Sequence, residues 1–88
     1  MTIEEFTKQW YPDDYEREAL YNFIKDCISN DSRNRYAIFN TLIRNDVRSI
    51  RQLRDITEDE LRKFRCIGEK RLELIMELKK VIDECVNE

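Results

Sequence analysis

Residues 61–72 read Leu-Arg-Lys-Phe-Arg-Cys-Ile-Gly-Glu-Lys-Arg-Leu, and they contain Gly68, the only glycine of the chain. This glycine lies between a short apolar-patterned segment and the longest helical pattern in the sequence. Glycine adopts a positive φ at little cost and lets another backbone come close. We therefore predict a loop at Cys66-Ile67-Gly68 that opens a helix from about Glu69 to about Val86. Backbone amides at such a helix start favour binding of a phosphate.

The rest of the chain shows helical spacing of apolar residues and no alternating run of the strand type. Thr57 and Glu60 have the spacing of a capping box, which predicts a helix of about two turns after Thr57. The other expected helices are a short one within residues 1–12, one that begins at Asp13-Asp14, one over residues 34–45 and a brief one at about 49–54. The chain is therefore predicted to be all-α, with five or six helices in a compact domain.

The apolar stripes predict which side chains form the core. Ile3, Phe6 and Trp10 recur at helical spacing in the first segment, and we expect them to pack inward. In the second segment the expected stripe contains Tyr15, Ala19, Leu20, Phe23, Ile24, Cys27 and Ile28. The three cysteines show no CxxC spacing, so we expect small core or boundary residues in a reducing compartment.

Composition excludes several classes of function. The chain has 88 residues, enough for one small domain, and its charged and hydrophobic fractions of 40% and 41% are typical of a soluble helical protein. It contains no histidine, so Ser–His and Cys–His nucleophile pairs are impossible. No apolar run could span a bilayer, and the acidic start is unlike a secretory signal. We expect a cytoplasmic, non-enzymatic protein without metal, cofactor, membrane or small-molecule substrate.

The net charge of −3 is unevenly distributed. Residues 1–32 carry eight acidic and three basic side chains, a net charge of −5, whereas residues 33–71 carry eleven basic and six acidic ones, a net charge of +5. Local charge governs the encounter with a phosphate backbone. We therefore divide the single domain into an acidic helical arm over 1–32 and a core over 33–88.

Several groups of residues in this core have the order and spacing found in a known protein family, and they align with it without a gap. They are Asn40-Thr41-Leu42, Val47-Arg48-Ser49-Ile50, Leu53, Thr57-Glu58-Asp59-Glu60-Leu61 and Ile67-Gly68-Glu69-Lys70-Arg71-Leu72. From Tyr36 to about Val81 the chain resembles the C-terminal domain of the bacterial RNA polymerase alpha subunit. The resemblance implies a compact fold with a helix-hairpin-helix or SAM-like core. It also implies binding to the minor groove of A·T-rich double-stranded DNA, and contacts with transcription proteins such as sigma factor, activators or polymerase.

The resemblance also implies a site. Asn40, Gly68 and Lys70 match polar or loop positions of the family's DNA surface, and four arginines that could supply charge lie close to them in the sequence, namely Arg33, Arg35, Arg44 and Arg71. Of these four, Arg35, Arg44 and Arg71 complete the predicted site. Other contact positions differ, because Ala37 stands at the family's central minor-groove arginine, Ile43 at a lysine and Cys66 at a loop asparagine. Two hypotheses therefore remain: a weak DNA-binding module, or a protein-interaction module of the same fold that has lost the DNA site.

Overall fold

The computed structural model describes residues 1–65 and 67–86, and over these residues it contains six helices and no strand. The helices are α1 (Ile3–Trp10), α2 (Glu16–Cys27), α3 (Ser32–Arg44), α4 (Ile50–Asp55), α5 (Glu58–Arg62) and α6 (Gly68–Cys85). The predicted all-α class and the number of helices are confirmed.

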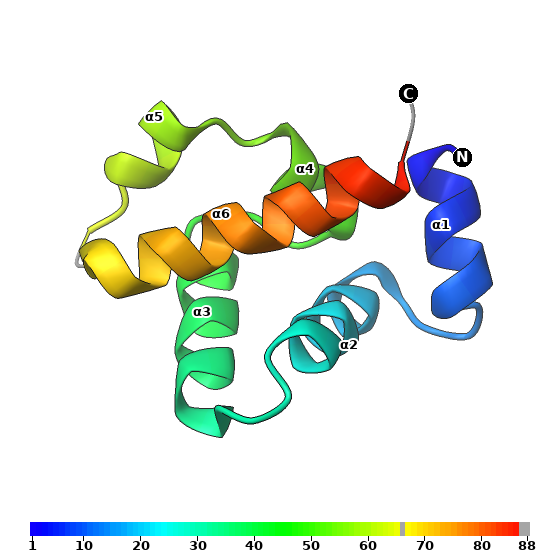
Figure 1. Cartoon of the computed structure of the whole chain (residues 1–88), viewed down its shortest axis with the longest axis horizontal. Helices are drawn as coiled ribbons and strands as arrows, with labels where there is room; N and C mark the ends of the chain where they lie inside the picture. Colours follow the sequence, from blue (N-terminus) through cyan, green and yellow to red (C-terminus); the bar gives the residue numbers. More distant parts are fainter. Residues whose placement is uncertain (66, 87–88) are drawn as a thin grey trace.

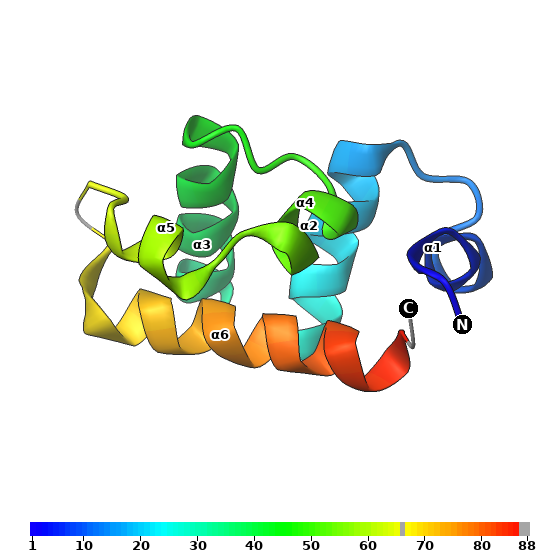
Figure 2. The ribbon, with the colours of Figure 1, turned by 90° about the horizontal axis from the view of Figure 1, so that it is seen from above.

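The long helix α6 runs across the molecule and packs against α3, α4 and α5 (Figures 1 and 2). The short helix α4 links the N-terminal helices to α6, because it contacts α1, α2 and α6. The start of α1 and the end of α6 lie at the same end of the molecule in both views.

One hydrophobic core joins the two parts of the chain. Its fully buried side chains come from five helices and are Leu20, Ile24, Ile38, Leu42, Leu53, Leu61, Ile75, Leu78 and Ile82. The first helix adds Ile3 and Phe6, which are only 2% and 4% exposed. Residues 1–32 are therefore an integral part of the core and not an appendage to it.

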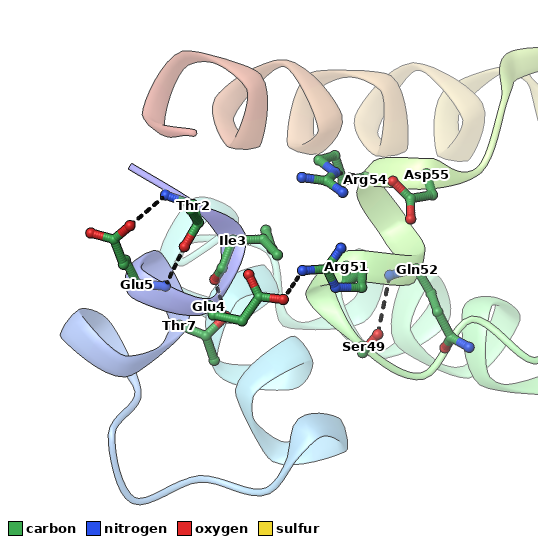
Figure 3. Close-up of polar contacts among 10 residues, drawn as sticks. All are labelled: Thr2, Ile3, Glu4, Glu5, Thr7, Ser49, Arg51, Gln52, Arg54 and Asp55. Atoms are coloured by element: carbon green, nitrogen blue, oxygen red, sulfur yellow. Dashed lines mark hydrogen bonds and ion pairs between the residues drawn. The ribbon is translucent and has the colours of Figure 1, made fainter. Parts of the chain in front are cut away.

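Side-chain caps explain where most helices begin. The Thr57 hydroxyl accepts a hydrogen bond from Glu60 N at 3.2 Å and completes the predicted capping box. Thr2 and Glu5 form a second capping box at the start of α1, and Ser49 Oγ accepts from Gln52 N at the start of α4 (Figure 3). Each cap satisfies an amide that has no partner inside its helix.

The end of α3 uses a positive φ without a glycine. Asp46 has φ 63°, Val47 N donates to Leu42 O at 2.9 Å, and Asp46 N donates to Ile43 O at 3.1 Å. This is the Schellman arrangement, in which the left-handed residue is usually Gly or Asn. The break predicted at Asn45-Asp46 is confirmed.

Polar contacts fix α4 to its neighbours. Glu4 of α1 forms an ion pair with Arg51 of α4 (Figure 3). On α6, the Lys79 ammonium donates to Leu53 O at 3.1 Å and to Arg54 O at 2.6 Å, and thus caps the last carbonyls of α4. Burial lowers the pKa of Lys79 because it disfavours the charged form.

Residues 11–15 connect α1 to α2 and are held at both ends. The Tyr11 hydroxyl donates to Asp26 Oδ2 at 2.8 Å, and Asn22 Nδ2 donates to Asp14 Oδ2 at 2.7 Å. Burial, the hydrogen bond and the negative charge of Asp26 together raise the pKa of Tyr11. The folded protein therefore requires the neutral phenol.

We expect Tyr11→Phe to lower the unfolding free energy by about 1 kcal/mol at neutral pH, because one hydrogen bond is lost. As pH rises through about 10, the phenol of the unfolded native chain ionises while the folded phenol keeps its proton. The native protein therefore loses stability above that pH, and Tyr11→Phe should lose less. Urea unfolding at neutral pH and above pH 10 measures both effects, and an unchanged pH dependence in Tyr11→Phe would contradict the assignment.

Four of the sequence predictions in the N-terminal half and at the chain end are wrong. Trp10 and Tyr15 are 60% and 82% exposed, so neither belongs to the core. The second helix begins at Glu16, because Asp14 is bonded to Asn22 instead of capping. Cys27 and Cys85 are exposed free thiols, and Val86 occupies the buried position at the end of α6. The third cysteine, Cys66, lies outside the described residues.

Candidate nucleic-acid interface

The backbone at the start of α6 has the positive φ that was predicted for Gly68. Gly68 has φ +73°, a conformation that residues with a Cβ rarely adopt, and it is the first residue of α6. In the described part of the chain, no side chain caps this helix start. Lys70 is exposed in the first turn, and Arg71 is half-buried and engaged in a contact of its own. An anion approaching the α6 amides would therefore meet at least one available cation.

The start of α3 lies within electrostatic reach of the start of α6. The pKa of Asp31 is lowered, first by hydrogen bonds from the Asn34 backbone and side chain, and further by the charges of Lys70 and Arg33. Arg33 and Lys70 come from different helices, yet both act on this one carboxylate. We call Arg33, Lys70 and Asp31 the helix-start patch.

Arg35 serves the packing of α2 against α3. Its Nη1 donates to Ser29 O at 3.3 Å, and its Nε is buried without a partner among the described residues. Hydrogen bonds from Tyr36 and then Arg35 lower the pKa of Tyr21 on α2. Tyr21 also packs edge-on against Phe39, with ring centroids 5.1 Å apart. The guanidinium of Arg35 is therefore committed to an aromatic cluster at this side of α3.

Asn40 and Arg44 are exposed on α3 and one turn apart, so they share a face. At 100° per residue, Arg35 and Arg44 lie on opposite faces of the helix. Figure 2 shows the end of α3, which carries Arg44, pointing away from α6. The structure thus groups Lys70, Arg71 and Gly68, separates Arg44 from them, and turns Arg35 toward α2.

Arg33 was noted in the sequence as a nearby source of charge, but it was not among the predicted site residues. Its signal was visible, since Arg33 lies next to the turn Ser29-Asn30-Asp31-Ser32 and belongs to the basic middle of the chain. Ala37 and Ile43, which replace basic positions of the resembling family, are half-buried and supply no charge. Cys66 lies outside the described residues.

The other side of the α6 start is acidic. A surface groove between α5 and α6 is lined by Leu72 and Met76 and by charged residues, of which four are acidic and two basic: Glu58, Glu69, Glu73 and Glu77, with Arg62 and Lys80. Repulsion from these carboxylates would leave the α3 side as the favourable approach for a phosphate. Among the described residues, no three His, Cys, Asp or Glu side chains converge as a metal site would require. No described helix has the length and apolar character needed to cross a membrane.

Comparisons with protein families, with curated proteins and with solved structures found no match to this chain.

Proposed function

We propose that this protein is a non-enzymatic, DNA-associated module of the transcription apparatus that binds the DNA backbone and minor groove weakly. The observation that carries the proposal is the packing of α3 against α6, two helices whose first turns carry the exposed cations Arg33 and Lys70. Both charges contribute to the lowered pKa of Asp31. In the resembling domain of the polymerase alpha subunit, the starts of the corresponding two helices form the DNA surface. The uncapped start of α6 adds amides that favour a phosphate.

The expected affinity is low and depends strongly on salt. Few phosphates could be neutralised by Arg33, Lys70 and Arg71, and Asp31 and Glu69 oppose the approach of DNA. Each phosphate contact contributes about −0.9 to the slope of log affinity against log salt concentration. Binding to an A·T-rich duplex should therefore be measurable at low salt and lost at physiological salt.

Substitutions in the patch test the proposal in both directions. In Arg33→Ala/Lys70→Ala, we expect weaker duplex binding and a salt slope reduced by about 2, because two phosphate contacts are lost. In Asp31→Asn, we expect tighter binding, because the negative charge is removed while asparagine still caps α3. Fluorescence anisotropy of a labelled A·T-rich duplex at two salt concentrations measures both changes.

Lys80→Ala is the matched control, because it removes an exposed cation from the same helix about three turns away. Its affinity and salt slope should stay close to those of the native chain. If Arg33→Ala/Lys70→Ala binds like Lys80→Ala, the patch is not the DNA surface. If neither the native chain nor Asp31→Asn binds at low salt, DNA binding is excluded.

The second candidate is a protein-interaction module that has lost DNA binding. It is favoured by the engagement of Arg35 with Ser29 and Tyr21, and by the carboxylates of Asp31 and Glu69 beside Lys70. Sigma factor, an activator or polymerase would then be the kind of partner that the resemblance implies. Absence of duplex binding in both the native chain and Asp31→Asn is the result that this alternative expects.

A further inference from the structure

Three aromatic rings form a cluster where α2 packs against α3. The Tyr21 ring on α2 lies 5.7 Å from the Tyr36 ring and 5.1 Å from the Phe39 ring, both on α3, measured between centroids. Phe39 is half-buried and packs against the core, whereas Tyr36 keeps 55% of its surface exposed. The cluster therefore presents one open ring to solvent and supports it with two others.

Hydrogen bonds hold this open ring in place. Those from Tyr36 and then Arg35 lower the pKa of Tyr21, and the same bond to Tyr21 raises the pKa of Tyr36. The Arg35 guanidinium also donates to Ser29 O at 3.3 Å, between the two helices. A ligand that stacks on Tyr36 would meet a ring that is ordered before binding, which lowers the entropic cost of the complex.

Cations lie on the same face of α2 as Tyr21. Arg17 and Lys25 are each four residues from Tyr21, so a cation lies one turn away on either side of the ring. Arg17 places its guanidinium over the Phe39 ring, 5.8 Å from the centroid. The charges of Arg35 and Lys25 both act on Tyr21. Arg17 and Lys25 are exposed, and neither has an ion-pair partner in the part of the chain that the structure describes.

A surface hollow between α2 and α3 brings rings and charges together. Its lining consists of Arg17, Glu18, Tyr21, Asn22 and Phe39. Glu18 contributes a carboxylate to this lining, and a second carboxylate, that of Asp14, accepts a hydrogen bond from Asn22 at 2.7 Å. The cations around the cluster are three, namely Arg17, Lys25 and Arg35. The balance is positive, so the surroundings of the open ring favour a ligand that has both a flat apolar face and a negative charge.

We propose that this region binds single-stranded nucleic acid. We call it the aromatic–cationic surface and define it by Arg17, Tyr21, Lys25, Tyr36 and Phe39. An unpaired base would stack on the exposed Tyr36 ring, and Arg17 and Lys25 would contact phosphates of the same strand. A duplex keeps its base faces stacked inside, so it could use this ring only by exposing a base. The inference goes beyond duplex binding and does not depend on it, because the helix-start patch shares no residue with this surface.

Two labelled strands separate base stacking from phosphate contact. The first is an oligothymidine of about ten nucleotides, a length typical of single-strand sites, and the second is an abasic strand with the same number of phosphates. In fluorescence anisotropy at low salt, we expect the native chain to bind the thymidine strand at least about 5-fold more tightly than the abasic strand. Equal affinity would overturn the inference, because phosphates alone would then account for binding. A uridine strand of the same length, with its own abasic counterpart, distinguishes RNA from DNA as the preferred ligand.

Substitutions of the open ring locate the stacked base. Tyr36→Ala should weaken binding of the thymidine strand about 5-fold or more, whereas Tyr36→Phe keeps the ring and should stay within about 2-fold of the native chain. Tyr15→Ala is the matched control, because it removes an exposed tyrosine that is not part of the cluster. It should bind like the native chain, and circular dichroism checks that all three variants are folded.

Substitutions of the charges test the phosphate contacts in both directions. In Arg17→Ala/Lys25→Ala, the slope of log affinity against log salt concentration should shrink by about 1.4, because two contacts with single-strand phosphates are lost. Glu18→Gln should tighten binding, because it removes a carboxylate from the hollow. An unchanged salt slope in the double variant would contradict the assigned role of the two cations.

Three other results would also overturn the inference. If Tyr36→Ala binds the thymidine strand like Tyr15→Ala, the strand binds elsewhere. If an acidic peptide binds with the dependence on Tyr36 and the thymidine strand does not bind, the surface takes a protein segment. If an A·T-rich duplex binds as tightly as the single strand and depends equally on Tyr36, the ring does not select unpaired bases. Failure of the duplex proposal is identified separately, because Arg33→Ala/Lys70→Ala leaves every residue of the aromatic–cationic surface unchanged.

Discussion

Leu53→Ala should lower the unfolding free energy by about 3 kcal/mol, a large fraction of the stability of a domain of this size. Leu53 is 0% exposed and lies on α4, which contacts α1, α2 and α6. The truncation removes apolar contacts and leaves a cavity where these helices meet. Because α4 has only six residues, it contributes little stability as an isolated helix and depends on this packing.

Urea unfolding monitored by far-ultraviolet circular dichroism measures the change, with Leu74→Ala as the control. Leu74 lies on α6 and is half-buried, so the same truncation should cost about 1 kcal/mol, since less apolar surface is lost. Equal losses for the two variants would mean that the packing of α4 against α1, α2 and α6 does not depend on Leu53.

Gly68→Ala should cost about 1–2 kcal/mol of unfolding free energy. Gly68 has φ +73°, and a Cβ added there would meet nothing within 4 Å. The expected cost therefore comes from the backbone conformation and not from a steric clash with a neighbour. The same substitution should also weaken any function that depends on the start of α6, because the strain falls on the residue that opens the helix.

Gly68→Asn distinguishes a cost of backbone conformation from a steric clash with a neighbour. Asparagine tolerates the left-handed region better than alanine although its side chain is larger, so it should cost less. Thermal unfolding of the two variants under identical conditions gives the order. A larger loss for Asn than for Ala would indicate a steric restriction that the backbone argument does not include.

Features set by local chemistry could be predicted from the sequence. The Thr57–Glu60 capping box, the break at Asn45-Asp46 and the glycine at the start of α6 each depend on residues within one turn of one another. The Thr2–Glu5 capping box has the same spacing and could have been predicted in the same way. The number of helices followed from these starts and stops together with the apolar spacing.

Features set by packing between helices could not be predicted in this way. Trp10 continues the apolar spacing of Ile3 and Phe6, but α1 is too short and ends where its neighbours no longer cover it. Arg35 looked like a surface cation because nothing in the sequence places Ser29 and Tyr21 beside it. That Arg33 and Lys70 both act on Asp31 depends on the packing of α3 against α6, which no local pattern specifies.

The shared position of the start of α1 and the end of α6 determines how the domain behaves on a tether. Helix α6 has 18 residues from Gly68 to Cys85, and these two ends lie roughly 25 Å apart along the helix axis. A fusion partner, resin or surface attached through either end of the chain would therefore leave the Gly68 end of α6 facing outward (Figure 1). Protein immobilised through either its N-terminal or its C-terminal end should present the helix-start patch to a ligand in solution.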